Sequence, residues 1–511
     1  MSNLTSRDAR LAWLLFGLAI CIYVLSAGGH FYSSDAHQKF LVVTAMLEDG
    51  IAAIDGGWVQ GRHGMRYAWF PLGASLIMLP GYVVGRMLAA ALPWLPAHDV
   101  ERLVISFQNA ATTAALLVGV FLVARLLGHR PRAALGAALA LGFATMAWPY
   151  AKSAWSEPPA TLALFLGLIC LWWASRPERP DREALRGLAA GGAILGLAIL
   201  IRQELALVLA GATAWLWVVR DSRRPLSGQA LLAFATPILA SFALHMAYEY
   251  ARYGTWLALP NYRLPVSGAA AFGPPEKAYR FLVSPNQGLL VFSPAALLGL
   301  AGLRRWCGRA PALAGLLAAS LLPLLGFYVF GWGPSSWSWG MRYAYVFLPF
   351  LMLPAAEVFE RPLRWWMRVT LAAGLAVQLL ALPYDFVYLF QRELAATPGA
   401  RIQVITTDPA RGPLVLAYKA LPELLAGTRS SWRPPRADEP ITQALRQARA
   451  DMVPDFWWCL YRRAPIAPSL LNGLAAALAL AALAFAFALA RAAREAANAQ
   501  GGPATGPPCG V

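Results

Sequence analysis

Long apolar runs separated by short polar stretches recur along the whole chain. A helix that crosses the hydrocarbon core of a bilayer needs about 20 residues, and most of these runs approach or reach that length. The pattern predicts about thirteen helices, near residues 11–27, 70–92, 103–125, 133–148, 158–174, 186–201, 203–219, 228–248, 288–303, 312–330, 342–359, 364–383 and 466–490. We therefore predict an all-α polytopic membrane protein with a bundle of about 12–13 transmembrane helices. No small-residue cleavage site follows the first run, so we expect that run to be retained.

Basic clusters between the apolar runs predict how the bundle is oriented. They lie at Arg125–Arg132, Arg176–Arg186, Arg220–Arg224, Arg304–Arg309, Arg361–Arg368 and Arg491–Arg494. Two runs separate each cluster from the next, so all of them share one face, which the excess of positive charge marks as cytoplasmic. Three runs lie between Arg10 and Arg125, and three full crossings would place Arg125 on the other face. We therefore interpret 70–92, which Pro80 and Gly81 interrupt, as a re-entrant or juxtamembrane segment.

The same pattern divides the chain into a bundle, a cap and a tail. Residues 1–383 form the predicted transmembrane region, and its first extracytoplasmic loop is 28–69. Residues 384–465 are polar and rich in Pro and Arg, which is typical of an extracytoplasmic cap rather than an independent domain. A last transmembrane helix follows at 466–490, and the low complexity of 491–511 predicts a disordered tail.

Composition narrows the class of protein further. Of 511 residues, 58% are hydrophobic and 14% are charged, whereas an ordinary soluble domain has roughly 25% charged residues. These values exclude a soluble globular protein, a disordered chain and a disulfide-rich secreted module. The net charge of +17 lies mostly between the apolar runs, so nucleic acid is not an expected partner. The five cysteines show no metal-ligand spacing, and motifs for nucleotide binding are missing.

Asp35 is the first candidate for a catalytic residue. It follows the first run by about eight residues, and Phe40, Val43 and Leu47 share one face of a helix expected after it. An aspartate near the membrane interface could act as a general base, or it could cap that helix.

A basic and aromatic cluster precedes the 70–92 segment, and it consists of Arg62, His63, Arg66 and Tyr67. Arginine offers forked donors to a phosphate and tyrosine adds another, so this cluster could bind a lipid-linked phosphate. The same residue types also anchor membrane proteins at the interface, and that interpretation stays open.

Three further charged residues lie at the ends of apolar runs. Arg202 in ILIRQELAL has Glu204 as its expected partner, and a charge at such depth is functional by default, although a tight loop reaching interfacial water would also explain it. Glu157 in WPYAKSAWSEPPA could start a helix, or act as a second acid or a metal ligand. For Arg342, at the start of a later apolar run, we predict contact with a phosphate.

Three tryptophans accompany Arg342 in WGPSSWSWGMRYAYVFLPF. Trp332, Trp337 and Trp339 are more typical of an interfacial aromatic belt than of a stacking platform for a sugar ring.

Four strings resemble motifs of the GT-C superfamily of polytopic glycosyltransferases, near the bacterial branch of aminoarabinose and protein O-mannosyl transferases. They are YSSDAHQKFLVVTAMLEDG, GMRYAWFPLGASLIMLPGYVVG, FLVSPNQGLLVFSP and the tryptophan-rich string that contains Arg342. Together they cover roughly residues 1–360, in this order. The resemblance implies a GT-C-like bundle with juxtamembrane helices in its first loop, placed in the bacterial inner membrane with its active site facing the periplasm.

The resemblance also implies partners and residue roles. A polyprenyl-phosphate-linked sugar would be the donor, a glycan, lipid or protein the acceptor, and Asp35 the general base. Arg66 and Tyr67 match the stretch that contacts the donor phosphate, and Arg202 and Arg342 match further arginines of the family. An acidic pair common in the first loop is missing, because Ser34 and Ala36 flank Asp35. The resemblance therefore fixes no cofactor and leaves a divalent cation open.

We therefore expect a single inverting displacement. Two other classes remain alternatives at this point: a flippase or transporter of lipid-linked sugars, with arginines along its substrate path, and a polysaccharide polymerase or ligase. Neither of them needs Asp35.

Overall fold

The structure is a computed structural model that describes residues 4–219, 227–256, 272–332, 337–397, 399, 401–427 and 440–500. Within these residues the chain is mostly helical, and its two strands are only two residues long each. The predicted class, an all-α polytopic membrane protein, is confirmed. The basic cluster Arg220–Arg224 lies outside the described residues.

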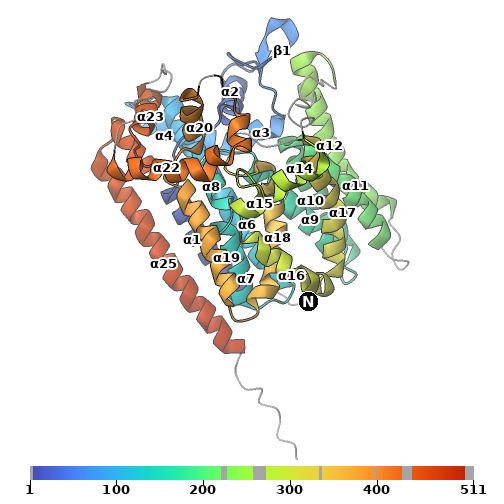
Figure 1. The fold of residues 1–511 in the computed structure, drawn as a ribbon. Helices are drawn as coiled ribbons and strands as arrows, with labels where there is room; N and C mark the ends of the chain where they lie inside the picture. Colours follow the sequence, from blue (N-terminus) through green and yellow to red (C-terminus); the bar gives the residue numbers. More distant parts are fainter. Residues whose placement is uncertain are drawn as a thin grey trace, which may run out of the picture.

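A bundle of long helices forms the body of the molecule (Figure 1). Its members are α1 (Ser6–Leu25), α6 (Gln108–Leu126), α7 (Pro131–Phe143), α9 (Glu157–Ala174), α10 (Asp181–Ile201), α11 (Leu207–Val219), α12 (Gly228–Tyr253), α16 (Ala296–Arg309), α17 (Pro311–Gly326), α18 (Leu348–Phe359), α19 (Trp365–Ala381) and α25 (Pro468–Gln500).

Shorter elements connect and cover these helices. The first loop contains α2 (Ser34–Glu48), β1 (Val59–Gln60), η1 (Arg62–Gly64), β2 (Arg66–Tyr67), α3 (Leu72–Leu76), α4 (Leu79–Ala91) and α5 (Ala97–Ser106). Connections within the bundle contain α8 (Ala147–Ala151), η2 (Gln203–Ala206), α14 (Pro274–Leu282), α15 (Leu289–Phe292), η3 (Phe327–Trp332) and η4 (Arg342–Phe347). The cap contains α20 (Phe386–Ala395), α21 (Gln403–Thr407), η5 (Pro409–Arg411), α22 (Pro413–Ala426), α23 (Pro440–Ala450), α24 (Trp457–Leu460) and η6 (Tyr461–Arg463).

Every predicted apolar run forms helix. By length and composition, nine helices of the described chain could cross a membrane, and α19 with α20 would make a tenth, bent by 64°. The helices Pro131–Phe143 and Gln203–Val218 are apolar but shorter, and α16 ends in several arginines. Nine or ten candidate spans among the described residues are fewer than the 12–13 predicted, because the sequence pattern counted short or arginine-ended apolar helices of this kind as crossings.

Ion pairs hold the basic clusters Arg125–Arg132 and Arg304–Arg309 at one end of the bundle. Arg125 at the end of α6 contacts Asp8 at the start of α1, with 2.6 Å between Nε and Oδ1. At the same end, His129 lies 3.2 Å from Glu360, and a further pair joins α16 to α18 at 2.5 Å. The first loop and the cap lie at the opposite end (Figure 1). The contact between Asp8 and Arg125 requires an even number of crossings between them.

The segment Leu72–Ala91 has the length and apolarity of a span, yet its contacts keep it beside the first loop. Arg86 in α4 lies 2.8 Å from Glu48 at the end of α2 and 3.0 Å from Glu101 in α5. Together with the pairing of α1 and α6, this places α3 and α4 on the first-loop side, as the re-entrant or juxtamembrane interpretation expects.

The last helix differs from its predicted bounds. It was expected to end at 490, but α25 continues to Gln500, so the first ten residues of the predicted tail are helical. Their sequence, RAAREAANAQ, is rich in good helix formers, and Arg491 pairs with Glu495 one turn later. The rest of the tail, 501–511, lies outside the described residues.

Candidate functional site

Asp35 enters the site on the first turn of α2. Ser33 is the N-cap of this helix, since its side chain accepts a hydrogen bond from the Ala36 amide, so Asp35 is not the cap. Phe40 and Val43 on the predicted apolar face are buried, which fixes the rotation of the helix, whereas Leu47, expected on the same face, is 52% exposed near its end. Asp35 keeps about a quarter of its side chain exposed, and its Oδ2 lies 3.5 Å from Arg342 Nη1.

Glu157 and Arg202 form the buried centre of the site. Glu157 is the first residue of α9, so the helix-start interpretation is correct, and its side chain is only 5% exposed. Arg202 lies in extended backbone between α10 and η2. Its guanidinium contacts Glu157 at 2.5 Å and Glu204 at 2.6 Å. The predicted pairing of Arg202 with Glu204 is confirmed, and Arg202 does not reach open water because its side chain is 13% exposed.

Close packing at Gly73 holds the end of α10 in place. A Cβ atom at Gly73 would lie 2.5 Å from the carbonyl carbon of Leu200. Only glycine therefore lets α3 approach the last turn of α10, directly before Arg202.

Arg342 connects the two acids. Its Nε lies 4.0 Å from Glu157, and its Nη2 donates a hydrogen bond of 3.1 Å to the Tyr343 hydroxyl. The Tyr343 ring stacks on Tyr328 with 5.3 Å between centroids, and the Tyr328 hydroxyl donates to Glu204 at 3.1 Å. A small cavity opens among these residues, with about 200 Å³ of empty space when the adjoining open solvent is included. It is lined by Glu157, Ala160, Thr161, Arg202, Leu205, Tyr328, Arg342, Tyr343 and Val346. Asp35 is not a lining residue and contacts Arg342 beside the cavity.

Lys39 completes the charged cluster, and sequence reasoning missed it. It lies one turn after Asp35 in α2, it is 3% exposed, and its Nζ lies 4.5 Å from the centroid of the Phe70 ring. Among the described residues no carboxylate lies within ion-pair distance of Nζ. Burial lowers the pKa of Lys39 below its usual value, although Asp35 and Glu157 act to raise it. The i, i+4 spacing from Asp35 was the available signal, because it places both side chains on one face.

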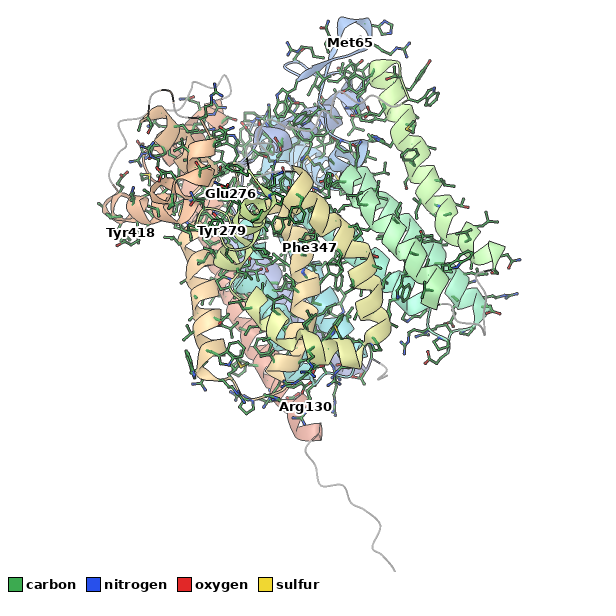
Figure 2. The ribbon with its side chains drawn as sticks, turned by 45° about the vertical axis from the view of Figure 1, so that its right-hand side comes forward. Met65, Arg130, Glu276, Tyr279, Phe347 and Tyr418 are labelled. Atoms are coloured by element: carbon green, nitrogen blue, oxygen red, sulfur yellow. The ribbon has the colours of Figure 1, made fainter. Side chains whose placement is uncertain are left out.

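The structure does not bring the predicted basic and aromatic cluster into this site. Arg62 and Arg66 are exposed on the β1–β2 hairpin, where Met65 marks the tip (Figure 2). Arg66 Nε donates to the Gly57 carbonyl at 2.7 Å, and Arg62 lies over the Tyr250 ring. Tyr67 is buried against Tyr253. A role of Arg62, Arg66 and Tyr67 in holding the donor phosphate stays a prediction.

The tryptophan string adopts neither of its expected arrangements in its described part. Trp339 is fully buried and packs against Phe292 and Phe386, so it belongs to neither a belt nor a platform. Trp337 is half-buried against the same core. The side chain of Trp332 lies outside the described part of the chain.

A divalent cation would have to share Glu157 with Arg202. Among the described residues, no three His, Cys, Asp or Glu side chains come together closely enough to hold a metal ion. Glu157 is bound to a guanidinium instead, so its alternative role as a metal ligand has no support from neighbouring ligands.

No protein-family model matches the chain, and no curated protein matches it significantly. Solved structures with a similar fold include ArnT from Cupriavidus metallidurans in the apo state, with 16% identity, 96% of this chain and 78% of that chain covered, and a TM-score of 0.44. ArnT bound to undecaprenyl phosphate has 17% identity to this chain and a TM-score of 0.40. This match covers 95% of this chain and 77% of that chain. The archaeal oligosaccharyltransferase AglB from Archaeoglobus fulgidus, in complex with an inhibitory peptide and a dolichol-phosphate, has 14% identity to this chain and a TM-score of 0.42. This match covers 81% of this chain and 55% of that chain.

ArnT and AglB are both GT-C glycosyltransferases, the superfamily that the sequence motifs resemble. This chain spans about half the length of AglB. At these identities and TM-scores the similarity assigns no role to any residue.

Proposed function

We propose that this chain is a membrane glycosyltransferase that moves a sugar from a polyprenyl-phosphate donor to an acceptor in the cell envelope. The observation that carries the proposal is the cluster of Lys39, Arg202 and Arg342 with Asp35 and Glu157. These five residues come from four separate parts of the chain and meet at the first-loop end of the bundle. Charges at such a place are unfavourable unless they serve a function.

The cations suit the leaving group. A sugar joined to a polyprenyl phosphate is a phosphate diester, and the phosphate gains negative charge as the bond to the sugar breaks. Arg202 and Arg342 are held in place by carboxylates and can stabilise that charge without rearranging. Lys39 does not line the cavity, but it has no carboxylate partner among the described residues, so its ammonium is a further candidate contact for a phosphate oxygen.

Asp35 suits the proton transfer. Its carboxylate is about a quarter exposed and lies 3.5 Å from Arg342 Nη1, whereas Glu157 is enclosed and bound to Arg202 at 2.5 Å. In the proposed step, the acceptor hydroxyl or amine gives its proton to Asp35 and attacks the anomeric carbon. The bond from that carbon to the phosphate oxygen breaks, and the polyprenyl phosphate leaves with the electron pair. A single displacement of this kind inverts the anomeric centre.

The position of the cluster supports an extracytoplasmic reaction. Asp35 and Lys39 lie on the first loop, at the end of the bundle opposite the basic clusters (Figure 1). An excess of arginine marks the cytoplasmic side, so the proposed site faces the periplasm of a bacterial inner membrane.

Replacement of Asp35 tests the proposal. Purified protein is incubated with a panel of polyprenyl-phosphate sugars in the presence of lipid, glycan and protein acceptors, and the released lipid phosphate is measured. We expect release with the wild type, its loss by a factor of about 10² or more in Asp35→Asn, and unchanged donor binding in that variant. Asp49→Asn, at the exposed other end of α2, is the matched control and should behave as the wild type. Normal turnover by Asp35→Asn would contradict the role of Asp35, and no release with any donor would contradict the proposed activity.

A further inference from the structure

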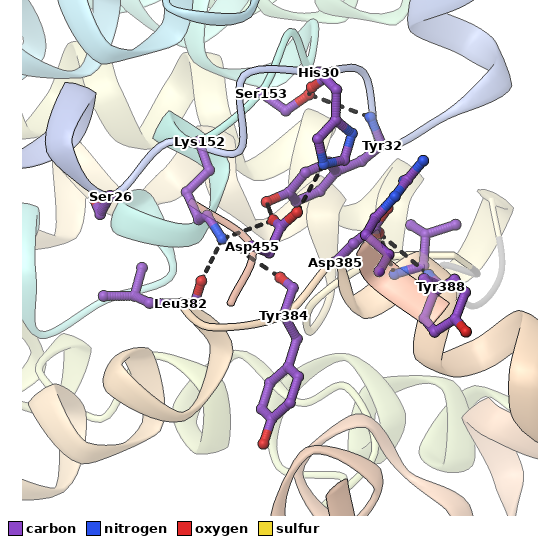
Figure 3. A network of polar contacts seen from close by, with 12 residues as sticks. Ser26, His30, Tyr32, Lys152, Ser153, Leu382, Tyr384, Asp385, Tyr388 and Asp455 are labelled. Carbon is purple, nitrogen blue, oxygen red and sulfur yellow. Dashed lines mark hydrogen bonds and ion pairs between the residues drawn. The ribbon is translucent and has the colours of Figure 1, made fainter. Parts of the chain in front are cut away.

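A second buried cluster of charges lies outside the proposed site, at the junction of the cap with the first loop. Its centre is Asp455, between α23 and α24, which is 1% exposed. Figure 3 shows three side chains that converge on this carboxylate. His30 contacts it at 2.7 Å, Lys152 Nζ lies 3.0 Å from Oδ2, and the Tyr32 hydroxyl donates to the same oxygen.

Lys152 uses its whole ammonium group in this cluster. Besides Asp455, it donates to the carbonyl oxygens of Leu382 and Tyr384, directly after α19. Burial acts to raise the pKa of Asp455, but Lys152 and His30 outweigh this and hold it well below the usual range. Burial lowers the pKa of Lys152 below its usual value, although Asp455 acts to raise it. Removal of Asp455 would leave this buried ammonium without a carboxylate, and removal of Lys152 would leave the carboxylate to His30 and Tyr32.

The residues around Asp455 belong to the two segments that deliver the acids of the proposed site. Tyr32 precedes Asp35 by three positions, and Lys152 precedes Glu157 by five. Ser153 joins these segments directly, because its hydroxyl donates to the His30 carbonyl at 2.8 Å and accepts from the Tyr32 amide at 3.3 Å.

The second of these segments is fixed from its other side by Asn109 in α6. Its side-chain amide donates to the Ser153 carbonyl at 2.6 Å and to the Trp155 carbonyl at 2.9 Å. The turn before Glu157 is thus held between α6 and the cap. Asp455 itself is not among the residues that line the cavity of the proposed site.

We propose that Asp455 is a positioning residue, which holds the segments before Asp35 and Glu157 in register through Lys152, His30 and Tyr32. The cap thereby controls the geometry of the active site, although it contributes no side chain to the lining of the cavity. This inference rests on the proposed function for its consequence in catalysis, but its structural content can be tested without sugar transfer.

Asp455→Asn tests the inference, since it keeps the size of the side chain and removes its charge. Asp451→Asn is the matched control, because Asp451 lies on the same segment and pairs instead with Arg463. In Asp455→Asn we expect kcat to fall at least about tenfold, because small misplacements of reacting groups have large effects on rate, while the donor Kd stays within about twofold. Hydrogen exchange of the amides at 30–38 and at 150–158 should become faster. In Asp451→Asn, kcat, the donor Kd and the exchange of these amides should all match the wild type.

A charge-neutral double variant separates positioning from folding. Lys152→Met alone removes the ammonium partner of Asp455, which keeps its contacts with His30 and Tyr32, and should lower the thermal midpoint in detergent, whereas Lys152→Met with Asp455→Asn should recover most of it. Recovery of the midpoint with a persistently low kcat supports the inference, and recovery of both overturns it. Unchanged exchange at both segments in Asp455→Asn overturns it as well. A wild type without transferase activity would refute the proposed function, whereas the exchange result would still decide whether Asp455 positions these segments.

Discussion

Lys39 shows why the charge at this site depends on pH. An ammonium group buried against Phe70 loses the solvation that favours its protonated form, so its pKa is lower than that of an exposed lysine. In the proposed reaction the protonated form holds the donor phosphate. Donor capture should therefore weaken as pH rises through this lowered pKa, before an ordinary lysine would titrate.

The alkaline side of the pH profile of kcat/KM for the donor checks this expectation, because that ratio reports the ionisation of the free enzyme. In Lys39→Arg the guanidinium stays protonated, so the alkaline decline should move to higher pH. In Lys39→Met, kcat/KM for the donor should be at least about tenfold lower at neutral pH, as expected for a lost charged contact. An alkaline decline that is identical in the wild type and in Lys39→Arg would show that Lys39 does not carry it.

At the scale of elements, the contact of α3 with α10 sets the position of Arg202. Gly73→Ala would place a methyl group 2.5 Å from the Leu200 carbonyl carbon, so the helices must separate. Overpacking of this kind lowers the free energy of unfolding by about 1–3 kcal/mol. We expect a lower thermal midpoint in detergent and a weaker donor Kd. Gly473→Ala in α25, where an added Cβ meets nothing within 4 Å, is the control, and an equal effect of both variants would contradict this account.

The elements were largely predictable from the sequence, because apolar runs bounded by basic clusters are readable residue by residue. The number of apolar runs between Arg10 and the cluster at Arg125 also led to the prediction that 70–92 does not cross the membrane. The contact between Asp8 and Arg125 agrees with this. The end of α25 was not predictable from apolarity, since its last turns are stabilised by helix propensity and an ion pair rather than by lipid.

Prediction of the site was less complete. Glu157, Arg202 and Arg342 were recognisable because charges beside apolar runs are rare, and the structure brings them together. Lys39 was overlooked because a lysine in a surface helix is usually exposed. Arg62 and Arg66 were predicted to bind phosphate because of their residue types, but they lie on the β1–β2 hairpin, outside the charged cluster. The direction of this hairpin depends on tertiary contacts such as that of Arg62 with Tyr250, which the sequence pattern does not reveal. Asp455 is more than 420 residues from His30, so no local pattern could join them.

At the scale of the whole molecule, the argument for a periplasmic reaction depends on which end of the bundle faces the cytoplasm. The tip of the β1–β2 hairpin and the start of α7 lie at opposite ends, as Met65 and Arg130 show in Figure 2. Both side chains are exposed, Met65 to 41% and Arg130 to 76%. Single cysteines at these positions, in an active variant that lacks the five native cysteines, can report their accessibility to a membrane-impermeant maleimide.

In cells with a permeabilised outer membrane and an intact inner membrane, we expect Met65→Cys to be labelled and Arg130→Cys to be labelled only after lysis. The physical reason is the excess of arginine at the α7 end, which translocation disfavours. Labelling of Arg130→Cys alone would mean that the bundle has the opposite orientation and that Asp35 faces the cytoplasm. Labelling of both before lysis would mean that Met65 and Arg130 lie on the same side of the membrane, which would contradict their placement at opposite ends of the bundle. Labelling of Met65→Cys alone places the charged cluster on the side where a lipid-linked sugar can meet an acceptor of the cell envelope.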